Sequence, residues 1–540
     1  MARPAARAFA RRCLLLCAVG GRSGARALSA VSKRPIAWTI AGSDSGGGAG
    51  VEADLRAFHA LGVHGCSVVT GLTAQNTLGV FGVAVTPAAH VRATLAALEV
   101  DLAPDAVKVG MLCTAATAIE VADYFEARKP KHCRVVVDPL LASSSGTKLI
   151  DDEGRAVVLS RVLPRCDVLT PNAREAEQLL GWAAGAISAP ADVRRAAAAL
   201  VEQTKAKSIL LKGGHWDADT AWCRDYFYDG NAAWWLASPR LEDAVAGGAH
   251  GTGCVLSSAL AAALASGAPM LDALVVAKGV CHAAIANAPK LGAGAPAALA
   301  SQTWPVQGDA CPTLRRDVPA FDSFFADNAA FPPPTLDGCA AMGLYAIGDS
   351  ASRCEELFDL GVSDVQLRVK DQSLDDVDAA VVSCVSAARR CNKRLWVNDH
   401  WRLAAKHGAY GVHLGQEDLE AATPADLNEL LESGLRLGLS THCESELALA
   451  LQLRPSYVAL GPIFGTTSKS VPFSPRGVDM VSRWRALLPP TTPLVCIGGI
   501  TLDTAASVVR AGADSIAVIS ALPRTPYDAA AAVEDWLRLF

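Results

Sequence analysis

The last 200 residues of the chain repeat one unit, a short β-rich run followed by an amphipathic helical pattern. This repeat constrains the fold more than any other feature. The runs are LYAIG (344–348), VQLRV (365–369), RLWVND (394–399), YGVHLG (410–415), LRLGLS (435–440), YVALG (457–461), LVCIGG (494–499) and SIAVIS (515–520). Eight consecutive β/α units in about 200 residues predict a compact (β/α)8 TIM barrel.

The first half of the chain alternates strands and helices differently. Between Pro35 and about Gly292, amphipathic helical patterns separate short β-rich runs such as IAWTIAG (36–42), RVVVDP (134–139) and SILLKGG (208–214). This alternation predicts an α/β domain whose mainly parallel, doubly wound sheet has helices on both faces. Ligands of such sheets bind where the strands end.

Two domains are expected, because a chain of 540 residues is too long for one core. We place the first domain at 35–293 and the barrel at 341–540. The segment between them, 294–340, is rich in Pro, Gly and Ala, and its PPP run forbids regular structure. We therefore interpret 294–340 as a linker.

Residues 1–34 differ in composition from the rest of the chain. They hold seven Arg, one Lys and no acidic residue, with abundant Ala, Ser and Gly. This composition is typical of an organelle transit peptide, so we expect a plastid location, with the mitochondrion or the cytosol as alternatives. The apolar run CLLLCAV is too short to span a membrane.

The overall composition excludes several functional classes. The chain is 51% hydrophobic and 19% charged, with a net charge of −5, and no basic excess points to nucleic acid. No later segment is expected to cross a membrane. The 16 cysteines include no C-x-x-C pair and no zinc spacing, so reduced thiols are expected. We expect small-molecule partners and a homo-oligomer.

Polar side chains stand where the barrel strands end, which is where such barrels place their reacting groups. Carboxylates next to cationic side chains predict a site that binds Mg²⁺ together with a polyphosphate, because Mg²⁺ is usually held by few protein carboxylates and by phosphate oxygens. The glycines after the seventh strand suit a second phosphate held by backbone N–H groups. The candidate residues are Arg368, Lys370, Asn398, Asp399, Asp418, Ser440, His442, Thr466, Ser468, Lys469, Gly498, Gly499, Ile519 and Ser520.

The motifs VQLRVKD, LWVNDHWRLA, GVHLGQEDL, GLSTHCESEL and YVALGPIFGTTSK resemble those of thiamine-phosphate synthases, and the resemblance covers essentially all of 341–540. It implies that pyrophosphate leaves hydroxymethylpyrimidine diphosphate with Mg²⁺ assistance. The thiazole nitrogen of hydroxyethylthiazole phosphate then captures the pyrimidine cation. By this resemblance Asp399 and Asp418 hold Mg²⁺. The resemblance also implies that Arg368, Lys370, Asn398 and Lys469 bind the diphosphate, and that both lysines are catalytic. The stretch from Gln366 to Lys370 and Ser440 would contact the pyrimidine. The thiazole phosphate would be bound by Thr466, Ser468, Gly499, Ile519 and Ser520.

The N-terminal domain also carries glycine-rich and polar segments at its strand ends. SDSGGGAGVEADL follows the first strand, and LTAQNT, VVDP, TPNAREAE, LLKGGH and AHGTGC follow later ones. Neither the dinucleotide fingerprint nor the P-loop is present. Glycines between a strand and a helix allow the backbone to approach an anion closely.

This ordered set resembles the hydroxymethylpyrimidine kinase / phosphomethylpyrimidine kinase family, a member of the ribokinase-like superfamily, over about 35–290. The resemblance implies two phosphorylations by ATP and Mg²⁺ that produce the pyrimidine diphosphate, the substrate of the barrel. It places Gly42, Asp54, Thr73, Gln75 and Met111 at the pyrimidine. It places Asn172, Glu175, Lys212, Gly251, Thr252 and Gly253 at the nucleotide.

The turn AHGTGC (249–254) opens an Ala-rich helix. By the resemblance, Gly251–Gly253 cradle the transferring phosphoryl group, with Lys212 near the phosphates. Cys254 stands where the wider superfamily usually has a catalytic Asp, so we expect its thiol to activate the hydroxymethyl group. A thiol has a reference pKa of about 8.5, and a helix N-terminus lowers it.

Two alternatives stay open at this point. In the first alternative, the N-terminal domain phosphorylates pyridoxal, which is also a heteroaromatic ring with a hydroxymethyl group. Comparing the turnover of pyridoxal with that of hydroxymethylpyrimidine would decide between the two activities. In the second alternative, the barrel is a relative of these synthases that binds a ligand without catalysing a reaction. The presence of Asp399, Asp418, Arg368 and Lys469 argues against that second alternative, because a binder needs no leaving-group machinery.

Overall fold

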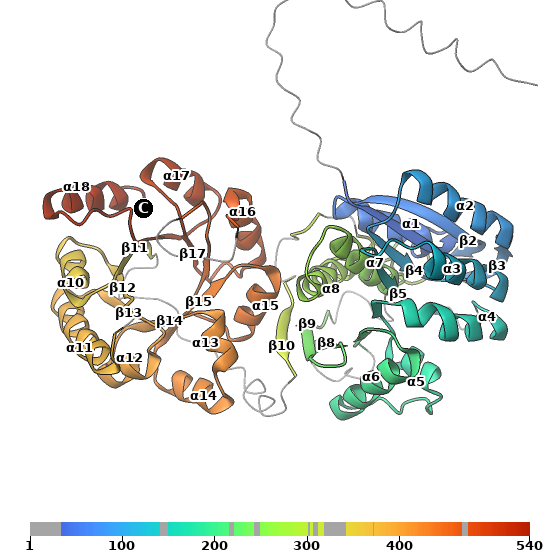
Figure 1. Cartoon of the computed structure of the whole chain (residues 1–540), viewed down its shortest axis with the longest axis horizontal. Coiled ribbons are helices and arrows are strands. Elements are labelled where there is room, and N and C mark those ends of the chain that lie inside the picture. Colours follow the sequence, from blue (N-terminus) through green and yellow to red (C-terminus); the bar gives the residue numbers. More distant parts are fainter. Residues whose placement is uncertain are drawn as a thin grey trace, which may run out of the picture. The chain divides into compact units, whose positions relative to one another are not determined.

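The computed structural model describes residues 34–140, 149–214, 221–241, 249–300, 303–305, 311–317, 342–370, 372–466 and 474–540. The strands of these residues form one open sheet and one closed barrel (Figure 1). Residues 1–33, nearly all of the predicted transit peptide, lie outside the described part. Within the described part, no helix combines the length and the apolar character needed to cross a membrane.

The N-terminal domain is built on a ten-stranded sheet in the order β10-β9-β8-β7-β6-β5-β4-β1-β2-β3. Strands β7, β6, β5, β4, β1 and β2 are parallel neighbours, and antiparallel strands extend both edges. The predicted parallel, doubly wound sheet is confirmed. The strands are β1 (Ile36–Asp44), β2 (His64–Asn76), β3 (Gly79–Val85), β4 (Ala106–Val109), β5 (Arg134–Val137), β6 (Val168–Leu169), β7 (Ile209–Leu211), β8 (Trp222–Tyr228), β9 (Ala233–Pro239) and β10 (Thr313–Arg316).

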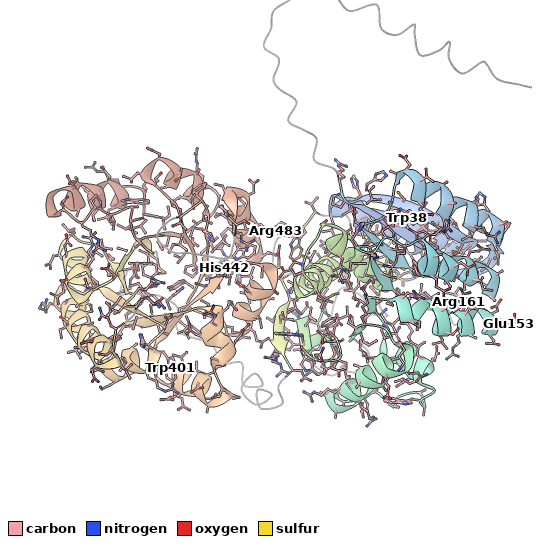
Figure 2. The ribbon with its side chains drawn as sticks, viewed as in Figure 1. Trp38, Glu153, Arg161, Trp401, His442 and Arg483 are labelled. Carbon is pink, nitrogen blue, oxygen red and sulfur yellow. The ribbon has the colours of Figure 1, made fainter. Side chains whose placement is uncertain are left out.

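Helices cover both faces of this sheet. Residues of α1, α7 and α8 pack against small side chains such as Ala37 and Ala106 on one face. Bulky side chains such as Trp38, which is fully buried on β1, pack against the helices of the other face (Figure 2). The helices are α1 (Gly50–Ala60), α2 (Ala88–Asp101), α3 (Ala115–Ala127), α4 (Asp152–Val157), α5 (Ala173–Leu180), α6 (Pro190–Thr204), α7 (Thr252–Ala265) and α8 (Met270–Ala286), with helical turns at Val158–Val162 and Leu163–Arg165.

Part of the predicted linker belongs to the N-terminal domain. Residues Thr313–Arg316 form β10, which pairs antiparallel with β9 as an edge strand. The Asp317 carboxylate accepts hydrogen bonds from Arg194, Tyr226 and Trp235. The sequence did not predict this strand, because its residues show little hydrophobic periodicity. The strand is stabilised instead by pairing with β9, which lies far away in the sequence. The sequence also suggests a short helix around 321–326, and those residues lie outside the described part of the chain.

The C-terminal domain is a closed barrel of eight parallel strands, as predicted. Its strands are β11 (Gly343–Gly348), β12 (Asp364–Leu367), β13 (Arg394–Asn398), β14 (Gly411–Leu414), β15 (Arg436–Thr441), β16 (Tyr457–Leu460), β17 (Leu494–Ile497) and β18 (Ser515–Val518). Its helices are α10 (Ala351–Asp359), α11 (Leu374–Cys391), α12 (Trp401–His407), α13 (Gln416–Ala421), α14 (Pro424–Glu432), α15 (Glu444–Gln452), α16 (Gly477–Leu487), α17 (Leu502–Arg510) and α18 (Pro526–Leu537).

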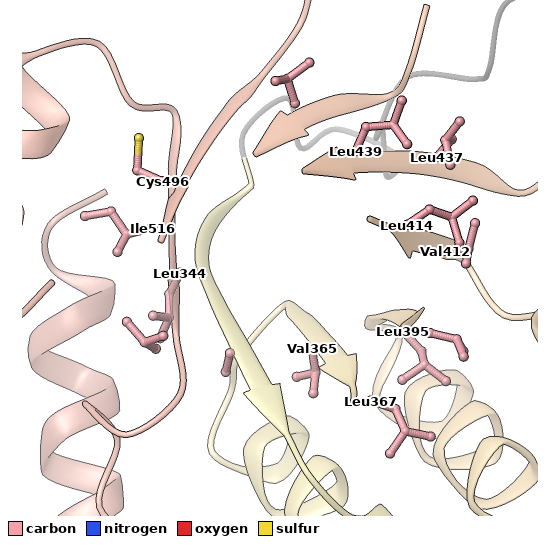
Figure 3. Packing of buried hydrophobic residues seen from close by; sticks show 14 of the residues in the cluster. Leu344, Val365, Leu367, Leu395, Val412, Leu414, Leu437, Leu439, Cys496 and Ile516 are labelled. Carbon is pink, nitrogen blue, oxygen red and sulfur yellow. The ribbon is translucent and has the colours of Figure 1, made fainter. Parts of the chain in front are cut away.

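Side-chain alternation along the barrel strands separates two cores. The outward side chains are almost all aliphatic and form the layer beneath the helices, shown in Figure 3 by residues such as Leu344, Leu395 and Leu439. The intervening inward side chains form a smaller aromatic core around Tyr345, Trp396 and Tyr457. Successive strand residues point to opposite faces, so one sequence pattern builds both layers.

Two glycines make room for the large rings of the inner core. A Cβ on Gly411 would lie 2.5 Å from the Trp396 ring, and a Cβ on Gly438 would lie 2.0 Å from Cζ of Tyr457. The barrel interior is therefore filled by pairing a residue without a side chain with an aromatic ring on the neighbouring strand.

Replacing Gly438 by Ala therefore overpacks the barrel. We expect Gly438→Ala to lower the free energy of unfolding by about 1–3 kcal/mol, the usual cost of an extra methyl group in a filled core. Urea unfolding followed by circular dichroism measures this. Gly465→Ala is the matched control, since no heavy atom of the described residues lies within 4 Å of the Cβ position at Gly465. Equal stability of the two variants would contradict the packing argument.

Candidate functional site

A cavity of about 470 Å³ opens at the carboxyl ends of the barrel strands. Nearly all of the predicted barrel residues that the structure describes line it. These are Gln366, Arg368, Lys370, Asn398, Asp399, Ser440, Thr466, Gly499, Ile519 and Ser520, joined by His442 and Gly498. These residues come from six different strands or the loops after them and meet in one space, as expected for a barrel of this kind. Ser468 and Lys469 lie outside the described residues.

The cationic side of the cavity is built around Asp399. Lys370 Nζ lies 2.6 Å from Asp399 Oδ2. Asp399 has a φ of 65°, a left-handed conformation that is unusual for a residue with a side chain and that gathers at functional sites. This backbone turn follows β13 directly and places the carboxylate beside the lysine.

Asp418, the second predicted metal ligand, does not line the cavity, but its carboxyl group interacts with that of Asp399. Burial raises the pKa of Asp418, and the neighbouring Asp399 raises it further. The Asp418 carboxylate also accepts a hydrogen bond from the Gly415 amide at 2.8 Å, at the start of α13. Two adjacent carboxylates repel each other, and a hard divalent cation relieves that repulsion, so this pair fits Mg²⁺.

Glycines shape the opposite side of the cavity. Gly498 and Gly499 both have positive φ values, and a Cβ on Gly499 would lie 2.3 Å from the Gly465 carbonyl oxygen. The loop after β17 therefore packs directly on the loop after β16, and the Phe464 amide donates to the Gly498 carbonyl at 2.9 Å. Such a close backbone approach is the geometry that a phosphate cradle requires.

One functional candidate, His413, was missed from the sequence. Its ring nitrogens lie 2.9 Å from Ser440 Oγ and 2.8 Å from the Tyr457 hydroxyl. That hydroxyl lies 3.0 Å from the Tyr345 hydroxyl, which accepts a hydrogen bond from Gln366. The two residues predicted at the pyrimidine, Gln366 and Ser440, are thus joined by one hydrogen-bonded chain. His413 could have been predicted from its position in the strand, because side-chain alternation directs it into the barrel interior.

In the N-terminal domain, the glycine-rich loop after β1 folds around the Asp44 carboxylate. This carboxylate accepts hydrogen bonds from the amides of Gly46, Gly48 and Ala49, and it lies 3.1 Å from His250 Nε2. Burial raises the pKa of Asp44, but the bonds from His250 and Gly46 outweigh it and hold the pKa below its usual value. Asp44 therefore organises the loop as a charged anchor.

The two glycine-rich segments of this domain touch each other. Gly251 has a φ of 83°, and a Cβ on it would lie 1.9 Å from the Gly48 carbonyl oxygen. His250 also lies 3.1 Å from Gln75 Nε2 at the end of β2. The turn before α7, the loop before α1 and the end of β2 therefore form one surface, which brings Gln75 and Gly251 together as predicted.

Charged groups line the other side of this turn. Lys212 Nζ lies 2.8 Å from Asp138 Oδ1 and 3.6 Å from Glu175 Oε2. The second Asp138 oxygen, Oδ2, is buried and has no hydrogen-bond partner among the described residues; it lies 3.2 Å from the Cβ position at Gly253. A buried, unpartnered carboxylate oxygen facing the predicted phosphate turn fits a cation.

Several residues predicted to contact ligands in the N-terminal domain also stabilise the local structure, as caps, packing positions or hydrogen-bond donors. Asn172 and Glu175 cap α5 reciprocally, with hydrogen bonds of 2.9 and 2.8 Å between side chain and backbone. Gly42 makes room for Met111, whose Cε would lie 2.1 Å from a Cβ there. Thr73 Oγ1 donates to the Ser43 carbonyl at the end of β1.

The expectation that Asp54 faces the pyrimidine is wrong. Its side chain is fully buried in an ion pair with Lys108, at 2.8 Å, beneath α1 and α7. It also accepts hydrogen bonds from Thr39 and Ser258. Asp54 lies on the buried face of α1, with Val51, Ala57 and Phe58, so its side chain points toward the sheet and supports the site from below.

The expectation of a lowered pKa at Cys254 is also wrong. Burial raises the pKa of the Cys254 thiol to about 11, although the Lys108 ammonium and the Gly50 amide lower it. Only 5% of the residue is exposed. The helix N-terminus is thus outweighed by the loss of water around the sulfur.

Fold and sites together define an enzyme in which an α/β phosphotransfer domain precedes a (β/α)8 barrel whose cavity brings cations, carboxylates and a glycine turn together. Comparison with known proteins agrees. A family model described as phosphomethylpyrimidine kinase matches residues 44–298, and one described as thiamine monophosphate synthase matches residues 344–522.

Curated relatives make the assignment specific. The thiamine-phosphate synthases of Shigella boydii serotype 4 and of Escherichia coli O157:H7 are each 48% identical over 192 residues, which cover 36% of this chain and 87% of theirs. The chain belongs to the thiamine-phosphate synthase family, and a phosphomethylpyrimidine kinase domain precedes its synthase barrel. It is a bifunctional transferase of thiamine phosphate biosynthesis, which disfavours a non-catalytic barrel.

Solved structures also resemble the first half of the chain. Phosphomethylpyrimidine kinase from Clostridium difficile 630 is 33% identical and is covered completely by 47% of this chain, with a TM-score of 0.40. The pyridoxal kinase from Staphylococcus aureus in complex with AMP-PCP and pyridoxal is 26% identical over 53% of this chain and 99% of its own, with a TM-score of 0.46. Of the two kinase activities, the family model names the phosphomethylpyrimidine one.

The contact between Gly251 and Gly48 predicts a steep sensitivity of the kinase. We expect Gly251→Ala to lower kinase turnover on the order of 100-fold, because the added methyl displaces the phosphate turn by about 1 Å. Steady-state assays of pyrimidine phosphorylation measure this. Gly82→Ala, with only one atom within 4 Å at 3.8 Å, is the control. Turnover of Gly251→Ala within threefold of the parent would contradict the prediction.

Proposed function

We propose that the kinase domain uses ATP and Mg²⁺ to phosphorylate hydroxymethylpyrimidine and then its monophosphate, and that the barrel couples the resulting diphosphate to hydroxyethylthiazole phosphate. The products are thiamine phosphate and pyrophosphate. One observation carries this proposal: the barrel cavity joins a cationic, carboxylate-lined side to a glycine cradle. It thereby offers separate places for a diphosphate and a monophosphate.

In the barrel, departure of pyrophosphate is the demanding step. Lys370 lies beside Asp399, and Arg368 lines the same cavity. Cations placed where negative charge would develop on the leaving group favour the transition state over the ground state. Mg²⁺ held by Asp399 and Asp418 would neutralise further charge on the diphosphate. Lys469 would add a third cation from the loop after β16. The chain from Gln366 to Ser440 through His413 would orient the pyrimidine.

In the kinase domain, the turn at Gly251–Gly253 would hold the transferring phosphoryl group. Lys212 faces that turn and would neutralise its charge, with Mg²⁺ beside the free oxygen of Asp138. A thiol whose pKa is about 11 is protonated at neutral pH. We therefore assign to Cys254 the orientation of the acceptor hydroxyl, since phosphoryl transfer depends mainly on positioning and charge stabilisation.

The test is reconstitution with the purified full chain. Hydroxymethylpyrimidine, ATP, Mg²⁺ and hydroxyethylthiazole phosphate are supplied together, and thiamine phosphate is measured. Chelation of Mg²⁺ is expected to stop the reaction and its return to restore it. Failure to form thiamine phosphate under these conditions would refute the proposal.

Within that assay, Asp399→Ala tests the metal role. We expect it to lower synthesis from supplied pyrimidine diphosphate at least tenfold and to raise the Mg²⁺ requirement, because one of two ligands is lost. Asp535→Ala, an exposed carboxylate on α18, is the control. Undiminished synthesis by Asp399→Ala would mean that the metal is held elsewhere.

We also propose that the protein is a homo-oligomer. The hairpin of β2 and β3 ends the sheet and carries exposed apolar side chains, among them Phe81 at 71% and Leu78 at 65% exposure. An apolar edge strand favours association with a second copy. Light scattering after size exclusion is expected to give a multimer for the parent and a smaller species for Phe81→Ser. A monomeric parent would exclude the proposal.

We further propose that residues 1–34 direct the protein to a plastid. Their arginine-rich composition without acidic residues supports this. A fluorescent reporter carrying residues 1–34 is expected to enter plastids of a plant cell, and one carrying residues 35–68 is expected to stay outside. Mitochondrial or cytosolic signal from the first reporter would favour one of the alternatives.

A further inference from the structure

A fully buried ion pair lies beneath the phosphate turn of the kinase domain. Lys108 Nζ lies 2.8 Å from both oxygens of Asp54, and neither side chain is exposed. The Asp54 carboxylate also accepts hydrogen bonds from Ser258 Oγ at 2.7 Å and from Thr39 Oγ1 at 2.5 Å. One carboxylate thus joins four elements: α1, β4, α7 and β1.

The sheet explains why the pair meets there. Thr39 and Lys108 are register partners on the adjacent parallel strands β1 and β4. Their neighbours Ala37 and Ala106 point to the same face and pack under α1 and α7. Small residues on this face let both helices approach closely, and the Lys108 side chain reaches up between them to Asp54.

Such a pair is not explained by stability alone. Burying two charges costs solvation that their attraction barely offsets, and apolar residues of similar volume often serve equally well. Burial lowers the pKa of Lys108, but the attraction of Asp54 outweighs that effect and raises the pKa, so the Lys108 ammonium is charged at neutral pH. A buried, fully satisfied charge cluster fixes geometry more strictly than apolar packing does.

The cluster is coupled to Cys254 through both helices. Ser258 stands four residues after Cys254 on α7, and Asp54 stands four residues after Gly50 on α1, so each pair shares one helix face. The Asp54–Ser258 bond therefore ties the helices one turn below the Cys254 sulfur. The Gly50 amide and the Lys108 ammonium both act on that sulfur and lower the pKa of its thiol.

We propose that Lys108 and Asp54 are a positioning pair for phosphoryl transfer, which locks α7 against α1 and β4 and so fixes the Cys254 sulfur at the acceptor hydroxyl. The pair touches no substrate and acts through Cys254. This inference rests on the proposed role of Cys254 in the kinase reaction.

The test uses the full chain with the double substitution Lys108→Met and Asp54→Asn. Ser258 and Thr39 donate to different oxygens of Asp54, so asparagine accepts from one hydroxyl at Oδ1 and donates from Nδ2 to the other hydroxyl oxygen. A hydrogen bond to each hydroxyl is thus retained while both charges disappear. We expect the kinase kcat to fall at least tenfold and the KM for ATP to change less than threefold. The rate at which iodoacetamide alkylates Cys254, followed by peptide mass spectrometry, is expected to change at least threefold.

Two controls exclude a general loss of folding. The barrel activity on supplied pyrimidine diphosphate is expected to be unchanged within twofold. The double substitution Lys278→Met and Asp225→Asn removes another buried pair of the same domain, 2.9 Å long. It is expected to leave the alkylation rate of Cys254 unchanged, because that pair faces Cys223 and Cys281 instead. An equal change in both double variants would overturn the proposal.

Cys254→Ala, assayed in parallel, separates this inference from the proposed function. If Cys254→Ala loses kinase activity and the Lys108/Asp54 variant keeps a kcat within threefold, the positioning role is wrong while the thiol role stands. If Cys254→Ala keeps full activity and the double variant loses it, the link through Cys254 is wrong. Loss in both, with altered alkylation, supports the inference.

Discussion

The alternation of side chains along parallel strands governs both domains, because it decides which residues meet the helices and which meet the ligand. On β15, Leu437 and Leu439 pack under the barrel helices, while Gly438 and Ser440 face the interior. On β4, Val107 packs against one layer of helices, and Lys108 reaches the other. A shift of one residue in either strand would exchange core and site.

Close backbone contacts then join separate loops into continuous surfaces at the strand ends. The Gly48 carbonyl occupies the place where a Cβ of Gly251 would stand, and the Gly465 carbonyl does the same at Gly499. Both domains therefore use one physical device, a glycine in left-handed conformation, to join loops from different strands. Charged groups accompany both turns: Lys212 lies beside the Gly253 turn in the first domain, and Lys370 lies across the cavity from the Gly499 turn in the barrel.

Much of the fold could be predicted from the sequence, because the hydrophobic periodicity of a strand or helix depends only on residues close together in the chain. All eight barrel strands and the parallel core of the first sheet followed from it. The strand-end positions and the family resemblance then placed many of the polar residues that line the barrel cavity. His413 and Lys108 were missed, since a polar residue inside a strand gives no local sign of what it faces. Strand β10 was missed because its pairing partner lies far away in the sequence. Asp54 was placed at the ligand, although it is buried beneath it.

By itself, the sequence determined the fold class of both domains, their families and the chemical types of residue at the strand ends. Only the tertiary structure decided how these residues are solvated and paired. Burial sets the pKa of Cys254 at about 11, and the adjacent Asp399 raises that of Asp418. Both effects come from groups distant along the chain, because the cost of a charge depends on the water removed and the partners brought near it.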